Sequence, residues 1–409
     1  MRRPSLLSLV LLPLLALLPG CGESCPEAPG LSEEACGEAR ALRLPDALPA
    51  SRGNAFADHP DAALLGFRVF FDARFSSNQE VRCASCHMPE RKFHDGRQTA
   101  RGLGRVTRNS PTLLNAAWLG WQAWDGHADS LWAQPLSALE SPAEMDFTRL
   151  ELAHRIRASF RVPYESVFGP LPPLEDPARF PARGAPGSAA FDGMAPEDQR
   201  AIHRVAANVG KALEAYQRKL AAGPSALDRH LAGEPDALSP EAVRGLAVFM
   251  RAGCAGCHGG PLLTDERFHN LGVPALPGDA PDPGRRQGLA RVMEDPLNAL
   301  GAFHDGPPED PSERYRAAAA DLGAFRTPSL RNVGLSAPYG HNGAFATLEE
   351  VVDFHLRGGG RGGAGFLGEV SPKLEARRLT AEERTELLAF LRSLDGRYPE
   401  PPWNNWPEK

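Results

Sequence analysis

Two short cysteine–histidine strings constrain this chain more than any other feature of its sequence. They read Cys83-Ala-Ser-Cys86-His87 and Cys254-Ala-Gly-Cys257-His258. C-x-x-C-H is the attachment signature of c-type haem, in which two thiols bond to the porphyrin vinyl groups and the histidine becomes the proximal iron ligand. One such string is also compatible with half of a zinc site or with a redox C-x-x-C pair. Two of them in an exported chain predict a protein with two covalently bound haems c.

The N-terminus has the pattern of a secretory signal peptide over residues 1–20, with two arginines ahead of a short apolar run. That run is too short to span a bilayer. The segment ending at Cys21 resembles a bacterial lipobox, so we expect Cys21 to be lipidated. Pro19 is atypical in such a box, and ordinary cleavage nearby is the alternative. Because Gly22 is not the aspartate of inner-membrane retention, we expect a periplasmic lipoprotein anchored in the outer membrane.

The cysteine count and the net charge limit the chemistry and the partners that we expect for this chain. Of the seven cysteines, four belong to the haem strings and one to the lipobox, which leaves Cys25 and Cys36 either to form a disulfide or to stay as free thiols. Loss of two arginines with the signal changes the formal net charge from -6 to -8. This mildly acidic balance does not suggest binding to nucleic acid. We expect membrane contact only through the lipid anchor.

Composition and periodicity predict a mainly α-helical chain with two haem domains. We expect a lipoprotein tether over 21–55, an N-terminal haem domain over 56–236, a C-terminal haem domain over 237–397 and a tail over 398–409. Segments rich in Pro and Gly predict long surface loops, a functionless one over 163–196 and one for partner contacts over 274–311.

Periodic apolar positions and capping residues predict the individual helices. We expect helices over 62–71 and 202–220, one beginning after an N-cap at Ser239, and capping boxes at Thr347–Glu350 and Thr380–Glu383.

An ordered series of further motifs resembles the bacterial dihaem cytochrome c peroxidase and MauG superfamily. The motifs are Arg108-Asn109-Ser110-Pro111-Thr112, Trp124-Asp125-Gly126, Gln134, Glu144-Met145, Phe268-His269-Asn270, the run Arg326 to Asn332, and Ala337-Pro338-Tyr339-Gly340-His341. The strings Arg286-Gln287-Gly288, Val292-x-x-Asp295-x-x-Asn298 and Gly323-Ala324-Phe325 resemble the MbnH group of MauG-like enzymes. The resemblance covers roughly residues 60–395 and implies two cytochrome c-like domains whose haems face a shared interface.

Peroxide cleavage at an open iron needs an acid–base group over the distal face, and Glu144 is our candidate. It also matches the distal glutamate of the superfamily, and Gln134 matches the distal glutamine. An isolated glutamate is more often a solvated surface charge, but the flanking motif favours function here.

The two haems are expected to differ on their distal sides. In many dihaem peroxidases a histidine closes the first haem until the enzyme is reduced. That position falls at Arg101, and the nearby His94 corresponds to a non-ligating residue, so we expect the first haem to stay open. The distal ligand of the second haem matches His355, fourteen positions after His341. Bis-histidine ligation would lower its potential relative to His/Met ligation.

Three further assignments follow from the resemblance. Trp124 matches the tryptophan that couples the haems electronically. Asn109, with the backbone carbonyls of Ser336 and Pro338, matches an inter-haem calcium site, whose oxygen ligands suit that cation. The other tryptophans of this region are explained by core packing or by a route for oxidising equivalents, and we favour packing. They are Trp118, Trp121 and Trp132.

The resemblance implies a peroxide-dependent oxidase that reaches a bis-Fe(IV) state and oxidises a tryptophan of a secreted, MbnP-like, copper-associated partner to kynurenine. The first alternative is a cytochrome c peroxidase that reduces hydrogen peroxide with electrons from a small cytochrome or cupredoxin. The second is a non-enzymatic dihaem electron carrier, which would need neither Glu144 nor Gln134.

Overall fold

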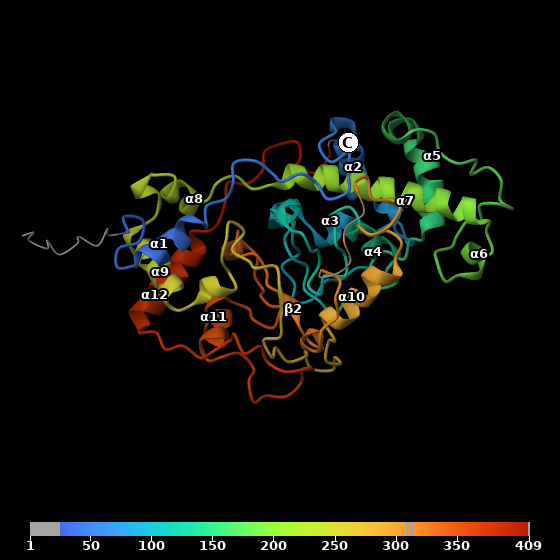
Figure 1. The fold of residues 1–409 in the computed structure, drawn as a ribbon. Coiled ribbons are helices and arrows are strands. Elements are labelled where there is room, and N and C mark those ends of the chain that lie inside the picture. Colours follow the sequence, from blue (N-terminus) through green and yellow to red (C-terminus); the bar gives the residue numbers. More distant parts are fainter. Residues whose placement is uncertain (1–24, 308–309, 311–313, 408–409) are drawn as a thin grey trace, which may run out of the picture.

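The computed structural model describes residues 25–307, 310 and 314–407, and its fold is mainly helical (Figure 1). The signal peptide and Cys21 lie outside the described residues. Regular strand is confined, in the described ranges, to one short antiparallel pair, β1 (Phe268–His269) and β2 (Phe325–Arg326). No helix among the described residues is both long enough and apolar enough to cross a membrane.

The first half of the fold is built around the packing of α2 against α7, with α5 beside them. The amphipathic pattern over 202–220 corresponds to α7, whose inner face is buried, and Pro60 occupies the first turn of α2 as expected for a residue without an N–H. The elements of this half are α2 (Pro60–Phe71), α3 (Cys83–Cys86), α4 (Gln134–Glu140), α5 (Arg149–Phe168), α6 (Ala189–Asp192) and α7 (Pro196–Gln217).

The second half is built around the packing of α9 against α12, which lie together on the left of Figure 1. Ser239 caps α9 and a capping box opens α12 at Thr380, as predicted. Thr347 caps α11, but the Glu350 carboxylate accepts from the Ala346 N–H rather than closing a box. The elements are α1 (Glu33–Arg40), α8 (Ala226–Leu231), α9 (Pro240–Arg251), α11 (Leu348–Leu356) and α12 (Ala381–Arg392).

The predicted tether over 21–55 is wrong for its described part. Cys25 and Cys36 form a disulfide on either side of the start of α1, and both are buried in the second core with Leu42. The Leu42 carbonyl accepts from Arg331 at 2.7 Å, and the Leu44 N–H donates to Asp228 at 2.8 Å. Apolar burial and the hydrogen bonds of its backbone to Arg331 and Asp228 therefore fix this segment on the C-terminal half.

The two predicted loops contain helices. The segment 163–196 is not one loop, because α5 continues through Pro163 to Phe168 and α6 follows within it. Pro163 has no N–H and cannot form the usual helical hydrogen bond. The helix accommodates it because Phe160, three residues before Pro163, has non-helical dihedral angles and kinks the helix there. The segment 274–311 contains α10 (Arg285–Glu294), whose apolar side packs on Trp121.

The predicted domain limits stay predictions, but the packing adds detail to them. Leu220 belongs to the first core, whereas Leu227 of α8 belongs to the second. The chain therefore passes between cores ahead of α8, before the expected limit at 236. Tyr398 and Trp403 of the tail return to the first core, where Trp403 contacts Phe67 of α2.

Candidate haem sites and the cavity between them

The first haem string forms a single helical turn, α3, which brings the two cysteines and the following histidine close together. The His87 N–H donates to the Cys83 carbonyl at 3.0 Å, and the Cys86 carbonyl accepts from the Ser110 hydroxyl at 2.9 Å. His87 Nδ1 lies 3.1 Å from the Phe93 carbonyl, to which it donates as the Nδ1-protonated tautomer. This leaves Nε2 available for iron.

The second string repeats the same local geometry. The His258 N–H donates to the Cys254 carbonyl at 2.9 Å, and His258 Nδ1 lies 3.0 Å from the Leu263 carbonyl. The four cysteines of the two strings carry no disulfide. Free thiol pairs, each beside a histidine oriented through Nδ1, fit covalently attached haem at both strings.

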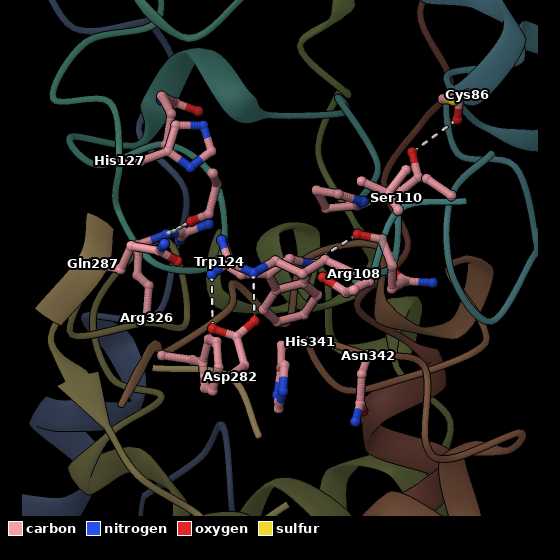
Figure 2. Close-up of a pocket in the computed structure, with 18 of the residues that line it drawn as sticks. Cys86, Arg108, Ser110, Trp124, His127, Asp282, Gln287, Arg326, His341 and Asn342 are labelled. Atoms are coloured by element: carbon pink, nitrogen blue, oxygen red, sulfur yellow. Dashed lines mark hydrogen bonds and ion pairs between the residues drawn. The ribbon is translucent and has the colours of Figure 1, made fainter. Parts of the chain in front are cut away.

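A cavity of about 470 Å³ opens beside the first string and extends to residues of the second half. Its wall includes Cys86, Trp124 and His341, and Figure 2 shows these side chains around one space. The cavity lies where the two halves meet, because the Asn109 N–H donates to the His341 carbonyl at 2.8 Å. A cavity beside the first string that reaches residues of the second half fits the expected shared interface.

Glu144 and Gln134 lie together at the first site, as predicted from sequence. Gln134 begins α4, and Glu144 follows that helix in a turn closed on Ser141. Both line the main cavity and also a smaller one of about 60 Å³ whose wall includes Cys83. Burial raises the pKa of Glu144, while a bond to Ser141 and nearby cations oppose that shift. A carboxylate whose pKa is raised accepts a proton more readily than an exposed one, and the resulting acid can return that proton in a later step.

The histidine nearest in sequence to the first site is committed elsewhere. His94 Nε2 bonds to the Leu335 carbonyl at 2.8 Å, and its Nδ1 accepts from the Gly96 N–H at 3.0 Å. Arg101 stands where the closing histidine was expected, and its side chain is exposed. This geometry supports the expectation that His94 is not a haem ligand.

His355 lies at the end of α11, on the same helical face as Val351. Its Nδ1 bonds to the Val351 carbonyl at 2.7 Å, which again leaves Nε2 available. Burial lowers the pKa of His258 to about 4, and His355 contributes to that shift, so the two rings are close enough to interact electrostatically. Two neutral imidazoles with available Nε2 atoms fit axial ligation of one iron.

Trp124 joins the two halves of the protein. Its indole N–H donates to the Asn109 carbonyl at 3.0 Å, and its own carbonyl accepts from the Arg326 N–H of β2 at 2.8 Å. The side chain lines the cavity between the halves (Figure 2). This position is compatible with the coupling role expected from the resemblance.

The calcium site stays a prediction. Asn109 is buried, and its amide nitrogen donates to the Arg97 carbonyl at 2.9 Å, which orients the side chain. Ser336 ends a short 3₁₀ turn, and Pro338 follows a cis peptide bond with Ala337.

Sequence reasoning missed a charged network that surrounds Arg108 at the cavity wall. Arg108 pairs with Asp125 at 2.6 Å and with both oxygens of Asp282 at 2.8 and 2.9 Å. Burial alone would raise the pKa of Asp125, but His127 and Arg108 hold it below the usual range. His127 Nδ1 lies 2.7 Å from Asp125, and its Nε2 lies 3.0 Å from the Ser137 hydroxyl. The Trp124-Asp125-Gly126 motif signals this place, but nothing in sequence identifies Asp282.

A second ion pair connects the 274–311 segment to the backbone that holds Glu144. Arg105 binds both oxygens of Asp279 at 2.5 and 2.6 Å. The loop that carries Arg105 donates from Leu103 to the Glu144 carbonyl at 2.9 Å. A Cβ on Gly102 would lie 2.4 Å from that same carbonyl oxygen, so this close approach requires glycine. The segment therefore fixes the loop against the residue expected to move protons.

Known proteins are similar in sequence to this chain over most of its length. The family described as di-haem cytochrome c peroxidase matches residues 60–236. Cytochrome-c peroxidase IdrP1 of Pseudomonas sp. (strain SCT) is 32% identical over 360 residues, which covers 82% of each chain. Methylamine utilization protein MauG of Methylorubrum extorquens is 31% identical over 358 residues, covering 86% of this chain and 83% of that protein.

Solved structures agree with these relatives. A crystal structure of a MauG-like protein associated with microbial copper homeostasis superposes with a TM-score of 0.62 at 28% identity, covering 88% of this chain and 97% of that one. The diheme peroxidase BthA of Burkholderia thailandensis superposes with the same TM-score at 23% identity, covering 87% and 94%, and supports the fold. Together with the paired haem strings, these relatives show that the chain belongs to the dihaem cytochrome c peroxidase and MauG superfamily, whose members are oxidoreductases that use peroxide and carry two haems c.

Proposed function

We propose that this enzyme uses hydrogen peroxide to oxidise a tryptophan of a secreted, MbnP-like partner protein, converting that residue to kynurenine. The observation that carries the proposal is the contrast between a first site, whose neighbouring His94 bonds to the Leu335 carbonyl, and a second site, where the buried His355 is an electrostatic neighbour of His258. The likeness to a MauG-like protein associated with copper homeostasis supports a copper-associated partner of the MbnP kind.

The residues around the cavity can carry out the proton transfers of the first step. Glu144 takes a proton from one oxygen of peroxide and returns it to the other, so that the second oxygen leaves as water. Gln134, as a neutral donor on the same wall, holds the bound oxygen without titrating. A haem held by the first string would supply the iron at which the O–O bond breaks.

The overall reaction balances with two peroxides for each tryptophan. Four electrons leave the indole, two oxygen atoms enter it from water or peroxide, and later hydrolysis releases formate to give kynurenine. Trp124, between the halves, is the proposed point at which the two haems are coupled. We further propose a periplasmic location with a lipid anchor at Cys21 and a calcium ion at Asn109, Ser336 and Pro338.

The alternative is a cytochrome c peroxidase that draws electrons from a small cytochrome or cupredoxin. The 32% identity to cytochrome-c peroxidase IdrP1 favours this reading. The electron-carrier alternative is not proposed further, because the relatives are enzymes.

The experiment combines three purified components: this enzyme, a secreted MbnP-like candidate partner that contains tryptophan, and hydrogen peroxide. The proposal expects mass spectrometry to find a tryptophan-to-kynurenine change in the partner only when all three are present. The Trp124→Phe variant should bind peroxide normally but support slower oxidation of the partner. Rapid steady turnover with a reduced cytochrome, and no altered tryptophan in the partner, would overturn the proposal and support the peroxidase alternative.

A further inference from the structure

The C-terminal tail brings two tryptophans back onto the first half of the fold. Trp403 packs against the first core, with its ring centroid 5.8 Å from that of Phe67 and 6.3 Å from that of Tyr216. Trp406 lies 5.1 Å from Phe71, and 44% of its surface is exposed.

Aromatic rings connect this tail to the wall of the first haem site. Phe70 lines the smaller cavity with Cys83 and lies 5.0 Å from Tyr216. Tyr216 lies 6.3 Å from Phe71, which in turn contacts Trp406. Centroid separations of this size place ring edges in contact. Tyr216 and Trp406 are the easily oxidised members of this series, Phe71 lies between them, and Trp403 contacts Tyr216 beside it.

A proton acceptor lies beside the exposed end of this series. The Trp406 indole N–H donates to the Glu90 carboxylate at 3.3 Å. By comparison, the indole N–H groups of Trp124 and Trp132 donate to neutral backbone carbonyls. Loss of one electron makes an indole N–H strongly acidic, and a carboxylate takes up that proton where a carbonyl does not. Arg82, 5.5 Å from the Trp406 ring, opposes the oxidation, but at the surface its charge is screened by water.

Trp121, which also borders the region between the halves, has the opposite surroundings. The guanidinium carbons of Arg285 and Arg314 lie 3.9 and 4.3 Å from its ring centroid, and the side chain is buried. Two cations beside a buried ring disfavour a positive charge on that ring, because the low local dielectric screens them little. Oxidising equivalents are therefore expected to avoid Trp121.

We propose that Trp406 is a site of oxidative modification, reached from the first haem site through the Phe70–Tyr216–Phe71 ring series when no partner is present. Trp406 loses two electrons in two steps, its N–H proton passes to Glu90, and water supplies one oxygen atom to the indole. Those two electrons and two protons reduce one hydrogen peroxide to two waters, so the sum is Trp plus peroxide giving hydroxytryptophan plus water. The inference rests on the family's peroxide chemistry and not on the identity of any partner.

The test uses the dihaem protein, one equivalent of peroxide and heavy-oxygen water, without air, partner or electron donor. Trypsin releases residues 398–409 after Arg397, and tandem mass spectrometry locates any added oxygen. An isotope-labelled synthetic peptide of residues 398–409 in the same tube reports oxidation by peroxide in solution. We expect heavy oxygen on Trp406 of the protein and none on the peptide or on Trp121.

Two matched variants sharpen the result. Glu90→Gln keeps a hydrogen-bond acceptor but removes the charge, so the modification should be largely lost while peroxide consumption is unchanged. Glu38→Gln, an exposed glutamate on α1, should behave as the native protein. Equal labelling of protein and peptide, undiminished labelling in Glu90→Gln, or labelling at Trp121 instead would overturn the inference. None of those outcomes bears on the partner reaction, which is measured on a different chain.

Discussion

The two haem strings share an attachment geometry but have different surroundings, so haems held there would differ on their distal sides. In both, a histidine that follows two thiols donates through Nδ1 to a backbone carbonyl, Phe93 in one case and Leu263 in the other. His87 borders a cavity that Glu144 and Gln134 also line, whereas the electrostatic neighbour of His258 is another buried imidazole, that of His355. We therefore expect the local string to fix attachment, and residues from distant parts of the chain to decide whether a site reacts with peroxide or stores and passes electrons.

The largest expected effect on the difference between the two sites comes from removing the proposed proton carrier, Glu144, from the first site. Glu144→Gln preserves shape but cannot accept a proton, so the reaction with peroxide should slow by about a hundred- to ten-thousand-fold. Stopped-flow mixing measures the rate, and Glu38→Gln serves as the matched control. Native kinetics in Glu144→Gln would remove this residue from the mechanism.

The second site can be altered without touching the first. His355→Met should replace the bis-histidine signature by a His/Met one and raise the potential of the second haem only, because a thioether stabilises the lower oxidation state. Potentiometric titration followed by absorbance separates the two haems. A shift in the first haem, or none in the second, would contradict the assignment of His355.

The pH dependence tests how Glu144 works. Burial raises its pKa, so the carboxylate that must accept the peroxide proton is lost as pH falls through a value above the usual one of about 4.3. The peroxide rate should therefore decline on the acid side at a pH too high for an exposed glutamate. His127 faces the same cavity, so the acid decline must vanish in Glu144→Gln and persist in His127→Gln. A decline that vanishes only in His127→Gln would reassign the proton acceptor.

The smallest expected effect concerns the ion pair that fixes the loop against Glu144. Asp279→Asn breaks the pair with Arg105, and because that arginine is half exposed the peroxide rate should fall only about twofold. Added salt should lower the native rate toward that of the variant and leave the variant unchanged. Equal salt sensitivity in both proteins would show that the pair does not position Glu144.

The parts of the fold that were predicted are those with a local signal. The haem strings specify attachment by residue type and spacing, and the N-caps at Ser239 and Thr380 are short-range hydrogen bonds. The pair Glu144 and Gln134 was found because the motif around them matches a known family.

The parts that sequence missed depend on contacts between remote segments. Arg105 and Asp279 are 174 positions apart, as are Arg108 and Asp282, and no local pattern relates them. The segment after Cys25 has the composition of a tether, yet it is ordered by a disulfide and by packing on α9. Pro163 indicated a loop, but the kink at Phe160 allows the helix to continue.

The central claim is that one haem site is open and the other is closed by His355, and electron paramagnetic resonance of the resting oxidised protein tests it most directly. The account predicts one high-spin ferric haem at the first site and one low-spin bis-histidine ferric haem at the second. The low-spin signal should change in His355→Met while the high-spin signal persists. Two low-spin haems in the resting protein, with no high-spin population, would contradict the account.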